Sequence, residues 1–226
     1  MSHDPQQLIQ SLLRSEMLRQ QHDARKDDRP PCTITVSRQS GALGKAFAKA
    51  LADRLGVRCY DKALVEAMAQ LAGVDVKVFE ALDESARALR SNWLELLFTD
   101  KPLHEQRYLQ TLVDVVIGIY RNGGVIVGRG ANFILDGTPA LRVRIVGSIP
   151  VRAARYAAEH DIDEEAAARA IEDIDQDRAR FVEKQFGKDL ADPVAYDLVM
   201  NSDRLAVDTM VEMAIRGLGD RNVDTA

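Results

Sequence analysis

Cysteine and aromatic residues are scarce in this sequence, and long apolar runs are missing. The 226 residues include 2 cysteines, Cys32 and Cys59, which have neither a Cys-x-x-Cys spacing nor a histidine close by. This argues against a cysteine-based metal site, and we interpret both residues as buried free thiols because each falls in or beside an expected strand. No apolar run approaches the roughly 20 residues that cross a bilayer, so no membrane association is expected.

The chain has no excess of positive charge. Its 35 acidic residues outnumber its 30 lysines and arginines, which gives a net charge of −5. A broad nucleic-acid-binding surface is therefore not expected, although a local arginine cluster could bind a small phosphate ligand. Residues 1–7 lack the basic start and apolar core of a secretory signal, so we expect a cytoplasmic protein. No metal-binding role is assigned to the histidines, which are His3, His22, His104 and His160.

Short apolar segments alternate with helical patterns from residue 33 onward. This alternation is typical of an α/β fold in which a parallel sheet is covered on both faces. The five expected strands are residues 33–37, 57–60, 125–127, 141–146 and 198–201. Because ligands of open parallel sheets bind beyond the carboxyl ends of the strands, the residues that follow each strand are the candidates for a site.

The sequence predicts one main domain with additions. Residues 1–31 are expected to form an accessory helix and a linker, residues 32–218 the domain, and residues 219–226 a tail. Within the domain we expect a helical insertion over about 61–122 and a lid-like segment over about 156–192, whose charges by default mark a solvated helix face. The N-terminal helix and an apolar cluster at residues 93–98 could each pack on this domain or form a homodimer contact.

The first expected strand runs into a glycine-bearing loop that opens an alanine-rich helix. Such a loop can point backbone N–H groups at an anion, and the helix N-terminus adds a favourable dipole. Gly44 and Lys45 match the P-loop pattern Gly-x-x-x-x-Gly-Lys-Ser/Thr, whereas Gln39 replaces the first glycine and Ala46 the magnesium-binding hydroxyl. Taken alone, this loop fits a nucleotide site or a tight strand-to-helix turn equally well.

Charged residues also follow the other strands, and guanidinium groups among them suit the two-pronged binding of phosphate oxygens. These residues are Asp61, Lys62, Arg129, Arg152, Arg155, Asp203 and Arg204. Arg142 and Arg144 alternate with apolar residues inside the fourth strand, so we expect both to face solvent or a neighbouring helix.

Several segments together resemble the cytidylate kinase-like family of P-loop proteins and occur in the family's order. They are residues 37–45, 60–62, 127–132, 174–180, 186–189 and 196–205. The resemblance covers about residues 32–216 and implies a three-layer P-loop fold with a five-stranded parallel sheet, a helical acceptor-binding insertion and an arginine-bearing lid. It also implies an ATP-dependent, Mg²⁺-requiring phosphotransferase that acts on a small-molecule nucleotide such as CMP or dCMP, or on a similar small acceptor.

The resemblance assigns roles to individual residues. The nucleotide would lie on a loop formed by Ser40, Gly41, Ala42, Leu43, Gly44, Lys45 and Ala46. Lys45 would neutralise the β and γ phosphates, while Asp61 and Arg129 would line the acceptor pocket. Lid residues Arg178 and Arg180 would fold over the transferring phosphoryl group. Asp177 would contact the substrate. Arg152 and Arg155, at the base of the lid, would bind the nucleotide.

Simpler interpretations of these residues stay open. Lys45 could face solvent like Lys49, and Asp61 could cap the following helix. Arg178 and Arg180 could form ordinary surface ion pairs with Asp175, Asp177 or Glu183.

The departures from the family pattern favour a second function class. Gly130 replaces the aspartate that helps true cytidylate kinases recognise cytosine. Ala46 leaves magnesium to be held by water, phosphates, Ser40 or Asp61. The alternative is therefore a catalytically weak or inactive nucleotide-binding sensor or assembly protein on the same fold.

Overall fold

A computed structural model describes residues 32–61 and 102–220. The chain divides into two compact units, of which the core unit comprises residues 32–59 and 123–226 and the insertion unit residues 1–31 and 60–122. The expected N-terminal helix, the apolar cluster at 93–98 and most of the helical insertion lie outside the described residues. In the insertion unit, the described helix is α6 (Pro102–Asn122).

A five-stranded sheet forms the centre of the fold, as predicted. Its strands are β1 (Thr33–Arg38), β2 (Cys59–Tyr60), β3 (Gly124–Val127), β4 (Leu141–Val146) and β5 (Leu198–Asn201). Their spatial order is β2-β3-β1-β4-β5, and the strands run in parallel. Because β1 lies in the middle, with Thr35 beside Ile126 of β3 and Arg142 of β4, the loop that follows it starts at the centre of the sheet edge.

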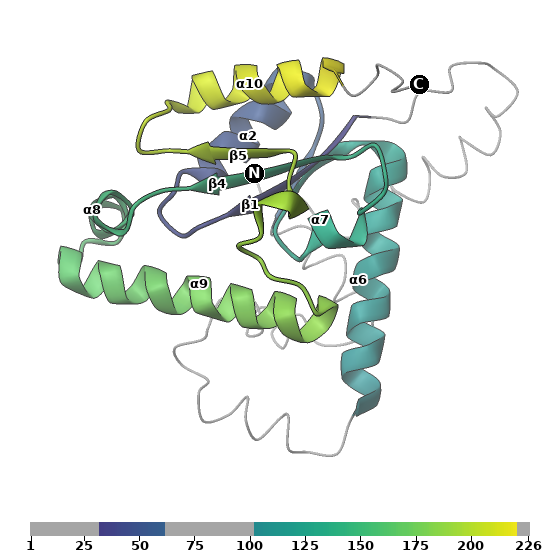
Figure 1. Cartoon of the computed structure of the whole chain (residues 1–226), viewed down its shortest axis with the longest axis horizontal. Coiled ribbons are helices and arrows are strands. Elements are labelled where there is room, and N and C mark those ends of the chain that lie inside the picture. Colours follow the sequence, from purple (N-terminus) through teal and green to yellow (C-terminus); the bar gives the residue numbers. More distant parts are fainter. Residues whose placement is uncertain (1–31, 62–101, 221–226) are drawn as a thin grey trace, which may run out of the picture. The chain divides into compact units, whose positions relative to one another are not determined.

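Helices lie on both sides of the strands (Figure 1), which completes the three layers. They are α2 (Gly44–Leu55), α7 (Ala131–Ile134), α8 (Ile149–His160), α9 (Glu164–Phe186) and α10 (Val207–Asp220), with a 3-10 turn at Pro193–Ala195. α2 and α10 pack together on one side, and α7 contacts β1 from the other. α8 and α9 pack against each other through small and apolar residues, Ala153, Ala157, Ala167 and Ile171.

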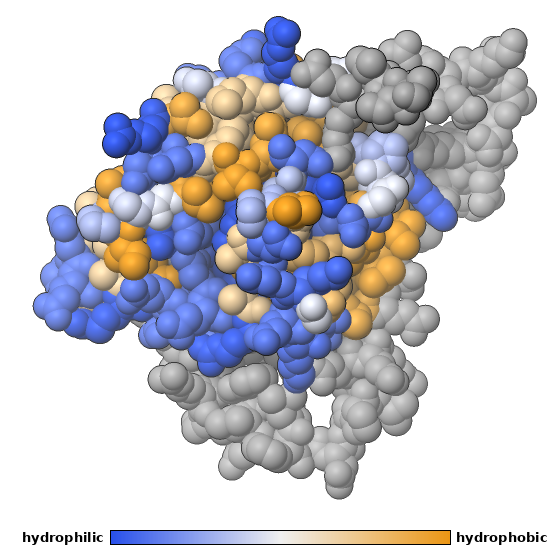
Figure 2. Space-filling model, viewed as in Figure 1, coloured by the Kyte–Doolittle hydropathy of each residue, from blue (hydrophilic) through white to orange (hydrophobic). Residues whose placement is uncertain are grey.

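The core joins the sheet to α2 and α10. Ile34 and Val36 of β1 and Phe47 of α2 are at most 1% exposed, and Met210 of α10 belongs to the same cluster. Central strands of a parallel sheet are covered on both faces, which explains their nearly continuous apolar sequence. In contrast, Figure 2 shows a largely hydrophilic surface over α9, as the charge pattern of this helix predicts.

Two expectations about side-chain exposure are wrong. Arg144 does not face solvent or a helix surface but is 7% exposed, because its guanidinium donates to Ser37 Oγ at 2.9 Å and lies over the Tyr196 ring. Nor are both thiols buried. Cys59 is exposed on the short edge strand β2, and Cys32 is half-buried, which raises the pKa of its thiol. Among the helices that the structure describes, none is both long and apolar enough to cross a membrane.

Candidate phosphate-binding site

The loop between β1 and α2 is tied to the end of β4. The Gln39 N–H donates to the Ile145 carbonyl at 3.0 Å, and the Gln39 side-chain oxygen accepts from the Gly147 N–H at 3.0 Å. Gln39 therefore does not disrupt the loop at the position where the P-loop pattern has glycine. Its amide side chain fixes the loop to the neighbouring strand end.

Backbone conformation then turns the loop into α2. Gly41 has a φ of +73°, and a Cβ there would lie 2.4 Å from the Arg152 carbonyl oxygen, so only glycine fits against α8. Leu43 is the N-cap residue with a φ of 60° and offers no side-chain cap. The first-turn N–H groups of α2 are consequently left for a ligand or solvent, since an α-helix cannot satisfy them internally.

A carboxylate from α9 is bound beside this loop. Asp175 accepts from the Ser40 N–H at 2.8 Å, from Arg152 Nη1 at 2.7 Å and from Arg178 Nη1 at 3.1 Å. Arg152, whose side chain is 4% exposed, also donates to the carbonyls of Ser40 (3.0 Å) and Gly147 (2.8 Å). One loop amide and two guanidinium groups thus converge on the oxygen atoms of a single anion, and donors of this kind bind carboxylate and phosphate groups alike.

The turn after β3 is built from three consecutive left-handed residues. Gly128, Arg129 and Gly130 have φ values of 76°, 60° and 66°. A left-handed conformation costs a non-glycine residue roughly 1–2 kcal/mol, so Arg129 is held in a strained backbone geometry of the kind that clusters at functional sites. A Cβ on Gly130 would lie 2.3 Å from the Phe186 ring, so the turn also contacts the end of α9.

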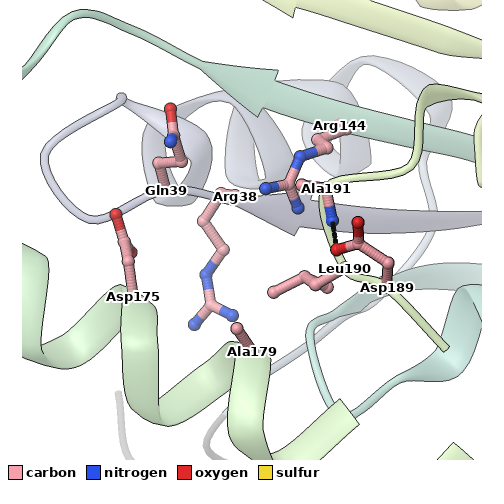
Figure 3. A pocket seen from close by; sticks show the side chains of 8 residues that line it. All are labelled: Arg38, Gln39, Arg144, Asp175, Ala179, Asp189, Leu190 and Ala191. Carbon is pink, nitrogen blue, oxygen red and sulfur yellow. Dashed lines mark hydrogen bonds between the residues drawn. The ribbon is translucent and has the colours of Figure 1, made fainter. Parts of the chain in front are cut away.

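A cavity of about 70 Å³ opens between the loop, β4, α9 and the segment after α9 (Figure 3). It is lined by Arg38, Gln39, Arg144, Asp175, Ala179, Asp189, Leu190 and Ala191. Pockets that enclose a whole small-molecule ligand measure about 300–1,000 Å³, so this cavity holds only part of one.

The family assignment follows from the whole arrangement and from a direct comparison. Residues 33–204 match the cytidylate kinase-like family. The chain belongs to this family. A search of curated proteins finds no match.

Solved structures agree with the fold of this cytidylate kinase-like protein. An uncharacterized protein from Eubacterium ventriosum has a TM-score of 0.62 at 21% identity, with 83% of this chain and 98% of that chain covered. A Thermus thermophilus protein has a TM-score of 0.51 at 14% identity, covering 86% and 100%. A shikimate kinase from Acinetobacter baumannii has a TM-score of 0.48 at 10% identity, covering 86% and 96%. At these identities the first two support the α/β fold alone.

Three of the residues assigned from the sequence meet around Asp175 in this family member. They are Ser40, Arg152 and Arg178, from the loop, α8 and α9. The remaining loop residues, Gly41, Ala42, Leu43, Gly44, Lys45 and Ala46, form the turn into α2 and its first turn. Arg155 instead binds Ser202, through its hydroxyl at 3.1 Å and its carbonyl at 2.8 Å.

Other assigned residues have more ordinary surroundings. Arg180 is exposed and pairs with Asp177 at 3.1 Å, which is the surface ion pair of the simpler interpretation. Lys45 is exposed, as is Lys49 one turn later. Asp61 directly follows β2 and belongs to the insertion unit. These placements leave the roles of the three residues as predictions.

The end of β5 adds a fixed negative charge. Asp203 accepts from the Ser148 N–H at 3.0 Å, at the start of α8. The hydrogen bonds from Ser148, with the positive charges of Arg155 and Arg152, lower the pKa of this carboxyl group. Asp203 therefore stays ionised beside the arginines and stabilises the N-terminus of α8.

Sequence reasoning missed two residues of this site. Asp175 was considered only as an ion-pair partner, because its sequence neighbourhood does not reveal that it meets Ser40. Arg38 was overlooked although it directly ends β1, and the rule that selected Arg129 as a strand-end arginine applies to it equally.

Proposed function

We propose that this protein is an ATP-dependent phosphotransferase that transfers the γ-phosphoryl group to a nucleoside monophosphate such as CMP or dCMP, or to a similar small acceptor. The observation that carries the proposal is the Asp175 carboxylate, which is bound by the Ser40 N–H, Arg152 and Arg178. A phosphoryl group presents the same kind of oxygen atoms and could replace the carboxylate on the same donors.

The reaction requires no protein nucleophile. An oxygen of the acceptor attacks the γ-phosphorus, the bond to the β–γ bridging oxygen breaks, and ADP leaves with the electron pair. Catalysis is then mainly positioning and neutralisation of spreading charge. In this proposal the loop and Lys45 hold the donor and Arg129 contacts the acceptor. Arg178 and Arg180 of α9 approach the transferring group.

α9 would serve as the lid over this reaction. Its Asp175 and Arg178 contact the loop, the latter through the Arg38 carbonyl at 3.3 Å. Binding of a donor phosphate would exchange these contacts for contacts to the ligand. A lid that closes over the site excludes the water that would otherwise hydrolyse ATP.

Magnesium would enter with the nucleotide. Within the described residues no group of three or more His, Cys, Asp or Glu side chains could hold a metal ion, and Ala46 has no hydroxyl. Phosphate oxygens and water would supply most ligands, with the hydroxyl of Ser40 as a loop candidate.

The first experiment is magnesium-dependent phosphoryl transfer from ATP to CMP, dCMP and UMP, with ATP binding measured by calorimetry in parallel. Transfer to one acceptor that falls at least about tenfold in Arg178→Ala would support the proposal. Arg169→Ala is the matched control, because Arg169 is an exposed α9 arginine paired only with Glu165 among the described residues.

A second function is favoured by the same carboxylate. Because Asp175 already occupies the loop donors, the protein could bind a nucleotide only as a sensor or assembly partner, without turnover. ATP binding with no transfer to any acceptor would select this alternative. Absence of both binding and transfer would contradict both functions.

A further inference from the structure

The first turn of α2 presents a glycine, not a lysine, toward the sheet. Gly44 is the first residue of α2 and shares the buried face of the helix with Phe47, Ala48 and Leu51. Lys45, one residue later, is rotated by about 100° to the exposed side, where Lys49 also lies. The buried position at the start of α2 therefore carries no side chain of its own.

Arg38 fills the space that this glycine leaves. A Cβ built on Gly44 would lie 2.3 Å from Arg38 Cβ and 2.7 Å from Arg38 Cγ. These are atoms near the backbone, which cannot move aside as the end of a flexible chain can. The stem of Arg38 thus passes directly over the first turn of α2, and Gly44 is required by this passage.

The head of the same side chain reaches the turn after β3. A Cβ on Gly128 would lie 2.5 Å from Arg38 Nη1. The absence of a side chain at Gly128 therefore leaves room for the Arg38 guanidinium. The guanidinium accordingly lies between the donor-side loop and the Gly128–Gly130 turn, and it lines the cavity together with Arg144 and Asp175. Figure 3 shows Arg38 extending from the end of β1 toward α9, beside Ala179.

We propose that Arg38, rather than Lys45, is the cation that contacts the transferring phosphoryl group, an inference that rests on the proposed phosphotransferase function. The planar guanidinium of the half-buried Arg38 can bind two phosphoryl oxygens at once, whereas the ammonium group of the exposed Lys45 cannot form such a two-pronged contact. Arg38 stays protonated throughout the transfer and supplies only positive charge and hydrogen bonds.

Its location also gives Arg38 a bridging role. Backbone atoms of Arg38 accept a hydrogen bond from Arg178 of α9, and its guanidinium lies at the turn that carries Arg129. Arg38 therefore contacts α9 through its backbone and the turn after β3 through its side chain. Its guanidinium can neutralise charge that spreads over the phosphoryl oxygens during transfer.

The test compares three substitutions of the same chemical kind in the full-length protein: Arg38→Gln, Lys45→Gln and the control Lys49→Gln. We expect Arg38→Gln to lower kcat with the best acceptor by about a hundredfold or more, and by more than Lys45→Gln does. Lys49→Gln should stay within about threefold of the parent protein. An Arg38→Gln protein within threefold of the parent, or a larger loss in Lys45→Gln, would overturn the inference.

A purely structural role for Arg38 is distinguished by a second variant. Arg38→Lys keeps the charge and most of the stem, so we expect it to fold, as judged by an unchanged circular dichroism spectrum. Its affinity for MgATP should stay within about tenfold of the parent protein, but its kcat should be lower. The ammonium group of lysine cannot donate two parallel hydrogen bonds as the guanidinium group does. Two results together would assign Arg38 to packing alone. One is a kcat in Arg38→Lys equal to that of the parent protein, and the other is a loss of kcat in Arg38→Gln that matches its fraction of unfolded protein.

Failure of the proposed function has a different signature. If the parent protein transfers to no acceptor but binds MgATP, the affinity itself is the readout, and Arg38→Gln should weaken it at least about tenfold and more than Lys45→Gln. If the parent protein binds neither MgATP nor inorganic phosphate, the result contradicts both the proposed function and the proposed role of Arg38.

Discussion

The Asp175 carboxylate and the Ser40 backbone N–H, 135 residues apart in the sequence, are joined by a 2.8 Å hydrogen bond. The bond connects the middle of α9 to the loop that follows β1. It uses a backbone donor of the kind that binds phosphate in glycine-bearing loops. The position of α9 against this loop is therefore stabilised by an interaction that a phosphate ligand on the loop would compete for.

Asp175→Asn should lower stability while favouring ligand binding. Arg152 and Arg178 would lose their carboxylate partner, and because the Asp175 side chain is 21% exposed we expect a loss of about 2–3 kcal/mol, below the 3–5 kcal/mol of a fully buried pair. MgATP should then raise the midpoint of urea unfolding more in the variant than in the parent protein. Glu165→Gln, from an ion pair whose side chains are 64% and 84% exposed, should cost under about 1 kcal/mol. Equal losses in the two variants would contradict this interpretation.

Tyr196→Phe should cost about 1–2 kcal/mol of unfolding free energy. The Tyr196 hydroxyl donates to the Leu190 carbonyl at 2.8 Å and accepts from Arg144 Nη1 at 3.3 Å, and the residue is 6% exposed. Removing the hydroxyl leaves the buried Arg144 with fewer acceptors and frees the segment after α9. Tyr156→Phe is the control, since the ring of Tyr156 packs on His160 and its hydroxyl bonds none of the described residues. Chemical denaturation of both variants measures the difference, and a loss of similar size in Tyr156→Phe would show that the hydroxyl network is unimportant.

Gly44→Ala should destabilise the protein although alanine favours helices by about 1 kcal/mol over glycine. The new methyl group would overlap the stem of Arg38, and overpacking of this kind costs about 1–3 kcal/mol. Gly219→Ala in α10 is the matched control, because none of the described residues lies within 4 Å of its Cβ position. We expect Gly219→Ala to be neutral or to stabilise by up to about 1 kcal/mol. The midpoint temperature of thermal unfolding should therefore be clearly lower for Gly44→Ala than for Gly219→Ala. A midpoint for Gly44→Ala that equals or exceeds that of Gly219→Ala would refute the packing argument.

Asp203→Asn should produce a pH-dependent loss of stability. The pKa of Asp203 is lowered in the folded protein, so its contribution is fully present above the unfolded value of about 3.9 and disappears as the pH falls through the lowered folded value. The difference in unfolding free energy between the parent protein and Asp203→Asn should thus be largest near neutral pH and shrink below about pH 4. Urea unfolding at pH 7, 5, 4 and 3 measures it. A difference that stays constant over this range would mean that the carboxylate charge contributes nothing.

The alternation of apolar segments and helices was sufficient to predict the sheet, because burial on both faces leaves a clear pattern in the sequence. The bounds of β4 and β5 are as predicted, whereas β2 is two residues shorter, since an edge strand needs less apolar sequence. The buried position of Arg144 could not be predicted, because it depends on Tyr196, which reaches β4 from a distant segment. Asp175 was missed for a similar reason. It lies in the middle of a helix, and only the packing of α9 brings it to the loop.

The contact between Gly130 and Phe186 limits which side chains position 130 can carry. Aspartate at position 130 would require a Cβ where the Phe186 ring now lies, 2.3 Å away, and Phe186 is itself stacked on Phe133. An aspartate at position 130 would therefore require the Phe186 ring to move, in addition to the strain of a positive φ. Replacing Phe186 by a smaller residue would remove the overlap and leave only the backbone strain. The two positions are therefore coupled, so substitutions at 130 and 186 should have non-additive effects on stability.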